Sequence, residues 1–155
     1  MRLSQRLAAA FHEAGHAFQA VREGAPLKRV TLAPGGEDAG PLRLRGPRQP
    51  AGGAARGSVE RHARVCLAGP MAQHRFNPRS MGHYRSHSDY ALARGLALRL
   101  GGAEVAEAWL RLWEAQVRED LAEGWPAVER LAAALLERGT VSGEEAGRLV
   151  LARAG

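Results

Sequence analysis

The chain has 155 residues, of which 45% are hydrophobic and 25% charged, and its formal net charge is +6. This length fits a single domain spanning residues 1–155 with one sizeable core, and the composition is typical of globular proteins. Because no run of about 18 apolar residues, no signal-peptide block and only one cysteine occur, we expect no membrane span, no internal disulfide and a cytoplasmic location.

The first predicted element is an amphipathic helix over residues 3–23, where apolar residues recur at spacings of three and four and Gly24 ends the pattern. Residues 27–33 (LKRVTLA) predict a short strand. The alternation of leucine and arginine over 42–45 predicts a second strand, and we expect the two to pair as a hairpin. Residues 46–57, rich in glycine, proline and arginine, predict a mobile loop.

The rest of the chain predicts helices. A helix over 58–76 is expected to begin at a capping serine and to kink or restart at Pro70. A polar connection over 77–86 follows it, and Ser86 or Ser88 is expected to cap the next helix. Further helices are predicted over about 88–100, 103–123, 125–138 and 142–151. The expected fold class is therefore mainly α with a small β-hairpin.

Residues 12–16 have the sequence HEAGH and fall inside the first predicted helix. Because helix positions four apart face the same way, His12 and His16 can hold one ion through their imidazole nitrogens. Glu13 is offset from that line and can reach a metal-bound water without binding the metal. Zinc lowers the pKa of such a water towards about 7, and the glutamate takes its proton during attack on a carbonyl. The spacing predicts a catalytic zinc site; two structural histidines on a helix edge are the alternative.

A catalytic zinc normally has three protein ligands, so the sequence must supply a third. Asp89 is the candidate, because it falls in the first turn of a predicted helix after the polar residues 86–88. An aspartate there could also simply stabilise the helix N-terminus. The rival ligands are His62, His74, His83 and His87, and the last two are close enough in sequence to replace the aspartate.

Two packing expectations concern small or lone residues. Gly15 and Ala8 leave a lane of small residues beside the histidines, where another element can approach closely. Cys66 lies among apolar residues, which favours a buried, inert thiol over a nucleophile.

Several segments beyond HEAGH extend this pattern. A later helix contains LAG at 67–69, Asp89 starts a helix with alanines in its next turns, and a Leu/Ala-rich helix precedes a short terminal one. Together these segments resemble the protease domain of the FtsH-type ATP-dependent zinc proteases over nearly the whole chain. HEAGH is the specific part of this resemblance.

The resemblance implies roles for particular residues. It implies that His12, His16 and Asp89 bind zinc and that Glu13 is the catalytic base. The family's hairpin offers a strand edge to an extended substrate, which would correspond to residues 27–45 here.

The chain also departs from the family. After LAG it has PMAQH at 70–74, where the family usually has small residues and two acidic ones. The 155 residues contain no phosphate-binding loop, so we expect cleavage of unfolded or short peptides, or dependence on a separate ATPase partner. A homo-oligomer is a further expectation, since the family's protease domains pack in rings.

The leading prediction is a zinc metalloendopeptidase, and the alternative is a catalytically silent relative that binds peptide or protein. The positive charge also invites a nucleic-acid interpretation. However, most of the arginines are interleaved with glutamates on helical stretches, and no recognition motif or aromatic stacking set occurs. We therefore expect no nucleic-acid partner.

Overall fold

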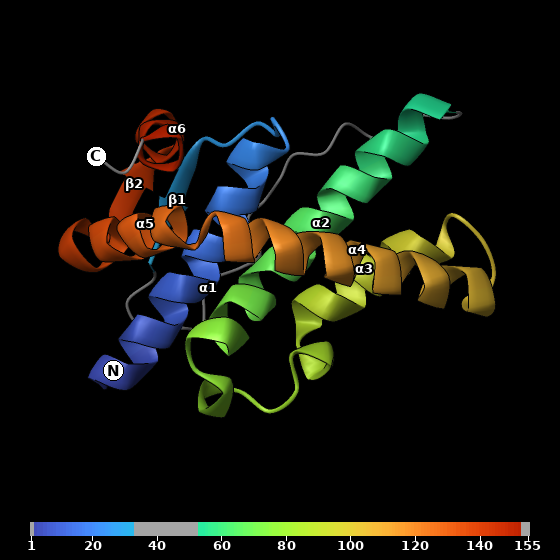
Figure 1. The fold of residues 1–155 in the computed structure, drawn as a ribbon, viewed down its shortest axis with the longest axis horizontal. Helices are drawn as coiled ribbons and strands as arrows, with labels where there is room; N and C mark the ends of the chain where they lie inside the picture. The colour runs from blue at the N-terminus through green and yellow to red at the C-terminus, as the bar shows by residue number, and fades with distance from the viewer. Residues whose placement is uncertain (1, 33–52, 153–155) are drawn as a thin grey trace.

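The computed structural model describes residues 2–32 and 53–152, and α-helices make up most of this part of the chain (Figure 1). The helices are α1 (Leu3–Arg22), α2 (Gly53–Phe76), α3 (Ser88–Leu98), α4 (Ala103–Glu123), α5 (Trp125–Arg138) and α6 (Gly143–Leu151). Two 3₁₀ turns, η1 (Pro78–Ser80) and η2 (Tyr84–Ser86), lie between α2 and α3. The mainly helical class predicted from the sequence is confirmed.

Helix α1 is the central element, since α2 and α5 make the most extensive packing against it. Its C-terminus is closed by Gly24, whose φ of 67° lies in the left-handed region. The backbone N–H of Gly24 donates to the Val21 carbonyl, and that of Ala25 donates to the Ala20 carbonyl. This double hydrogen bond ends the helix where the glycine predicted it would end.

Helix α2 begins at Gly53, five residues before the predicted cap, so the last part of the predicted loop is helical. Alanine and arginine are among the best helix formers, and at 54–56 they outweigh the flanking glycines. The other loop residues, 46–52, lie outside the described part of the chain. The helix continues through Pro70, so the predicted restart there is wrong.

The sheet consists of β1 (Arg29–Thr31) and β2 (Thr140–Ser142), which pair antiparallel with Val30 opposite Val141. Both valines are buried, while their neighbours on each strand are exposed. The expected hairpin partner at 42–45 lies outside the described residues. The strand that pairs with β1 thus lies far along the chain, at 140–142, where the sequence predicted only the start of the last helix.

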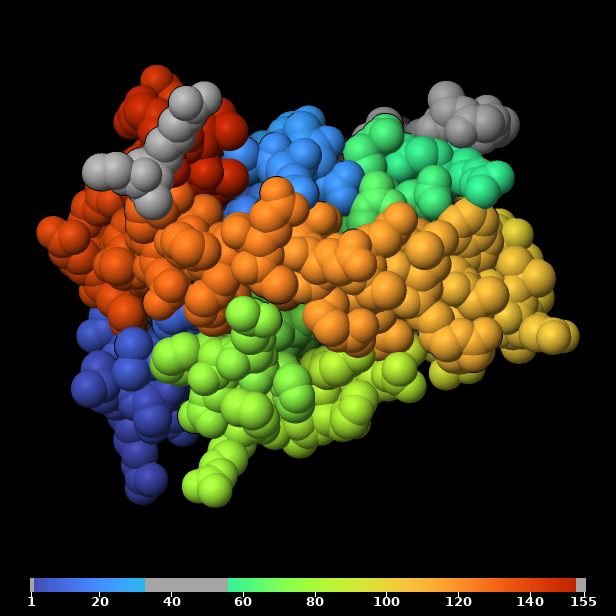
Figure 2. Space-filling view, in the orientation of Figure 1, coloured from blue at the N-terminus to red at the C-terminus, as the bar shows by residue number. Residues whose placement is uncertain are grey.

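Helices α1 and α2 approach each other closely through small residues. A Cβ atom added to Gly15 would lie 2.4 Å from the carbonyl oxygen of Ala68 and 2.5 Å from the Cβ of Ala72. Of the small-residue lane predicted beside the histidines, Gly15 is therefore a helix-packing contact, whereas Ala8 lines a cavity. Figure 2 shows α4 and α5 following one another as a continuous band across the face in view. None of the described helices is long and apolar enough to cross a bilayer.

Candidate metal centre

Three side chains from two helices converge on one point. His12 and His16 lie one turn apart on α1, and Asp89 lies in the first turn of α3. Oδ2 of Asp89 is 2.9 Å from Nε2 of His12 and 3.0 Å from Nε2 of His16, and the two nitrogens are 3.1 Å apart. His16 and Asp89 are buried, and the His12 side chain is only 12% exposed. The structure thus brings together the three residues that were predicted as metal ligands from the sequence.

A chain of hydrogen bonds fixes the tautomer of His12. The Ser80 hydroxyl donates to the carbonyl of Asn77 at 2.7 Å, so its oxygen accepts from the amide nitrogen of Gln73 at 3.0 Å. Gln73 therefore presents its oxygen to His12, whose Nδ1 donates to it across 2.9 Å. In the neutral ring the other nitrogen, Nε2, then directs a lone pair into the site.

The ring of His16 is held in the same way. Its Nδ1 lies 2.7 Å from the carbonyl oxygen of Val65, which can only accept, so Nδ1 donates and Nε2 of the neutral ring has the lone pair. Gly69 lies against this ring, because a Cβ there would be 2.2 Å from Nε2 of His16. The glycine of the LAG segment thus leaves the space that the imidazole occupies.

The arrangement fits a zinc ion. Two lone pairs and a carboxylate oxygen that meet at 2.9–3.1 Å repel one another unless a cation lies among them. Ligands at about 2.0–2.1 Å from a tetrahedral zinc would lie about 3.3 Å from one another, so a shift of a few tenths of an ångström is sufficient. Two imidazoles with one carboxylate are also the donor set of many catalytic zinc sites.

A proton can take the place of the metal. Burial alone would lower the pKa of His16, but its hydrogen bond to Asp89 and the charge of that residue outweigh burial and raise the pKa. Burial would raise the pKa of Asp89, but hydrogen bonds from His12 and His16 hold it well below its usual range. A metal ion that binds these groups must therefore displace the proton they share.

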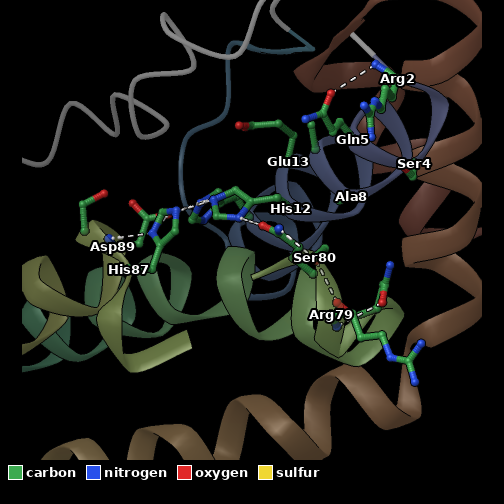
Figure 3. A pocket seen from close by; sticks show the side chains of 15 residues that line it. Arg2, Ser4, Gln5, Ala8, His12, Glu13, Arg79, Ser80, His87 and Asp89 are labelled. Carbon is green, nitrogen blue, oxygen red and sulfur yellow. Dashed lines mark hydrogen bonds and ion pairs between the residues drawn. The ribbon is translucent and has the colours of Figure 1, made fainter. Parts of the chain in front are cut away.

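Glu13 lies beside the three converging side chains. It is 8% exposed, and no hydrogen bond among the described residues involves its carboxylate. Burial raises its pKa, although the nearby His16 and His12 oppose this shift. The same residues line a cavity of about 550 Å³, in which Figure 3 shows Glu13 next to His12. A buried carboxylate with a raised pKa accepts a proton readily, as a general base must.

His87, one of the rival ligands, has another role. Its Nδ1 accepts a hydrogen bond of 3.0 Å from the backbone N–H of Asp89, so His87 caps α3 in place of the predicted Ser86 or Ser88. Burial lowers the pKa of His87, which favours the neutral ring that this cap needs. Its ring centroid lies 4.8 Å from that of His12, beside the converging atoms.

The other rival histidines lie outside the converging group. His83 is exposed, and its Nδ1 accepts from the backbone N–H of Arg85 at 3.2 Å. Among the described residues, the one group of three that could share an ion omits His62 and His74 as well.

A buried glutamate that the sequence did not indicate helps to hold the segment that leads into Asp89. Glu114 on α4 is 2% exposed and accepts hydrogen bonds from the Tyr84 hydroxyl at 2.8 Å and from Nε of Arg85 at 3.1 Å. Burial, together with the hydrogen bond to Glu114, raises the pKa of Tyr84. These contacts tie η2, which precedes Asp89, to α4. No sequence signal marks Glu114, because it resembles the other glutamates of its helix.

The chain was also compared with known proteins. No protein-family model matches it, and a search of curated proteins finds no match either. The resemblance to FtsH-type proteases therefore rests on the motifs of this sequence alone.

Proposed function

We propose that this protein is a zinc-dependent metallopeptidase of the FtsH-protease type that hydrolyses unfolded or short peptides. The observation that supports this most is the meeting of His12, His16 and Asp89 within 3.1 Å, beside the buried Glu13. These three residues would hold the ion. Gln73 accepts a hydrogen bond from Nδ1 of His12 and would thereby keep Nε2 of that ring directed at the ion.

Zinc bound at this centre would act as a Lewis acid and make water a better nucleophile near neutral pH. Glu13 takes the proton of the attacking water on its carboxylate and returns it to the nitrogen of the scissile peptide bond. Because burial raises its pKa, the carboxylate holds that proton more readily than an exposed glutamate would.

The alternative is a catalytically silent domain that binds peptide or protein. Glu13 argues against it, because a mostly buried carboxylate with a raised pKa beside the converging ligands is suited to a general base, which a binding domain does not need. A separate ATPase partner and a homo-oligomer remain predictions.

The decisive experiment compares the zinc-loaded wild type with Glu13→Gln on unfolded casein. The variant keeps the size of the side chain but removes the base, so it should retain zinc and lose cleavage by at least about a hundredfold. Glu119→Gln, an exposed position on α4, is the matched control and should cleave normally. Adding a chelator to the wild type should abolish cleavage.

Two results would contradict the proposal. Equal cleavage by wild type and Glu13→Gln would show that Glu13 is not the base. Failure of both zinc-loaded proteins to cleave casein would favour the silent peptide-binding domain.

A further inference from the structure

The cavity extends past the converging histidines along α1. One of its walls is the face of α1 from Gln5 to His12, and its far end is lined by Arg2 before α1 and Arg79 in η1. Figure 3 shows both arginines on one side of His12, with Asp89 on the other. The cavity therefore has a catalytic end and an arginine end.

The two ends differ in charge. Among the described residues that line the cavity, the acidic ones are Glu13 and Asp89, whereas the arginine end has Arg2 and Arg79 together with neutral polar side chains. The ion pairs that arginines make among the described residues all involve other arginines. Two such cations at one end of a cavity attract a negatively charged group.

The distance between the arginine end and the catalytic end determines how many residues would separate the negatively charged group of a bound peptide from its scissile bond. Arg2 and His12 are ten positions apart on a helix that rises 1.5 Å per residue, so they are about 15 Å apart along it. An extended peptide covers that length with four to five residues at about 3.3 Å each.

We propose that the arginine end is a subsite for a carboxylate of the bound peptide, about four to five residues from the scissile bond. The proposal rests on the proposed peptidase function and adds a substrate class to it: unfolded segments that contain aspartate or glutamate near the cleavage point. The carboxylate of a peptide C-terminus has the same chemistry, and the experiment separates the two sources.

The test measures binding without cleavage, using zinc-loaded Glu13→Gln protein and fluorescent ten-residue peptides with amidated C-termini. A single glutamate is moved along the peptide, and each peptide is compared with its glutamine counterpart by fluorescence anisotropy at low salt. Glutamate should strengthen binding by about two- to fivefold at one or two positions, an advantage that salt reduces. A second series has glutamine throughout and a free C-terminus.

Two double variants in the same background test the arginines. Arg2→Gln with Arg79→Gln should abolish the advantage of glutamate. Arg111→Gln with Arg118→Gln removes the same charge from exposed positions on α4 and should leave the advantage intact. Circular dichroism of each variant would check that it is folded.

Equal binding of all peptides, no binding of any, or an advantage that survives loss of Arg2 and Arg79 would overturn the subsite. An advantage confined to free C-termini would support the carboxylate subsite and identify its source as the chain end. Arginine-dependent binding by a protein that cleaves no casein would support the subsite and contradict the peptidase. Casein cleavage with no preference for acidic peptides would contradict the subsite alone.

Discussion

Replacing Gly69 with alanine should displace His16, because the two residues share one space. An added Cβ would lie 2.2 Å from Nε2, 2.4 Å from Cε1 and 2.6 Å from Cδ2 of the imidazole. Ordinary contacts between such atoms are about 3.5 Å, so the ring would have to retreat by about 1 Å. Metal–ligand distances tolerate only about 0.2 Å, so this displacement should weaken zinc binding strongly.

A glycine-to-alanine substitution should have the opposite effect on stability where the added Cβ meets no other atom. Alanine in place of a helical glycine stabilises a helix by about 0.5–1 kcal/mol. Gly95 in α3 has no atom within 4 Å of an added Cβ, so Gly95→Ala should gain about that amount. At Gly69, overpacking should cost about 1–3 kcal/mol and outweigh the gain.

Urea unfolding of the zinc-free proteins and competition with a chelating dye measure the two effects. We expect Gly69→Ala to be less stable than the wild type and to bind zinc at least about tenfold more weakly, a typical effect of disturbing the support of a metal ligand. Gly95→Ala should be more stable and bind zinc normally. If both variants were stabilised equally and bound zinc with wild-type affinity, the close packing of His16 on Gly69 would be refuted.

Four further predictions concern the site and its surroundings. Elemental analysis should find about one zinc per chain in the wild type and little in His12→Ala, whereas full retention would place the metal elsewhere. Gln73→Leu removes the acceptor for Nδ1 of His12 and should weaken zinc binding about 10- to 100-fold in the dye assay; unchanged affinity would exclude the supporting role. Because the folded state raises the pKa of Glu13, ionising it destabilises the zinc-free fold as pH rises above its usual pKa of 4.5. Zinc-free Glu13→Gln should therefore unfold at higher urea than the wild type at pH 7, with a smaller difference at pH 4, and a difference independent of pH would contradict this. Burial raises the pKa of the Cys66 thiol to about 12, so iodoacetamide should label it at pH 8 only after unfolding, and rapid labelling of the folded protein would show that the thiol is accessible.

The sequence predicted the helices best where glycine marks their ends. The predicted bounds of α4 and α5 agree with the structure, since Gly102 and Gly124 flank one helix and Gly139, with φ of 78°, ends the other. Strand β2 could not be predicted in this way. It has only three residues, and its extended form depends on pairing with a strand far away in the sequence.

The residues of the candidate site likewise differ in how far the sequence alone predicts them. His12 and His16 are related by helix geometry, so their common direction follows from the sequence alone. That Asp89 would meet them depends on how α3 packs on α2; the sequence indicated it only through its place in the first turn of a predicted helix and through the order of the motifs. Gln73 falls in the segment where the chain departs from the family, and that departure was its only signal. Glu114 acts through a tertiary contact that no local pattern records.

The pairing of β1 with β2 also affects the order in which a newly made chain can assemble. Thr31 and Thr140 are 109 residues apart, so at 5–20 residues per second a ribosome makes the second strand about 5–20 seconds after the first. Until then β1 has no partner, and α1 lacks the helix α5 that packs against it. Helix α1 thus gains these supports only after Thr140 has been made. We therefore expect the candidate site, whose two histidines lie on α1, to take up its final geometry only after both β2 and α5 have been made.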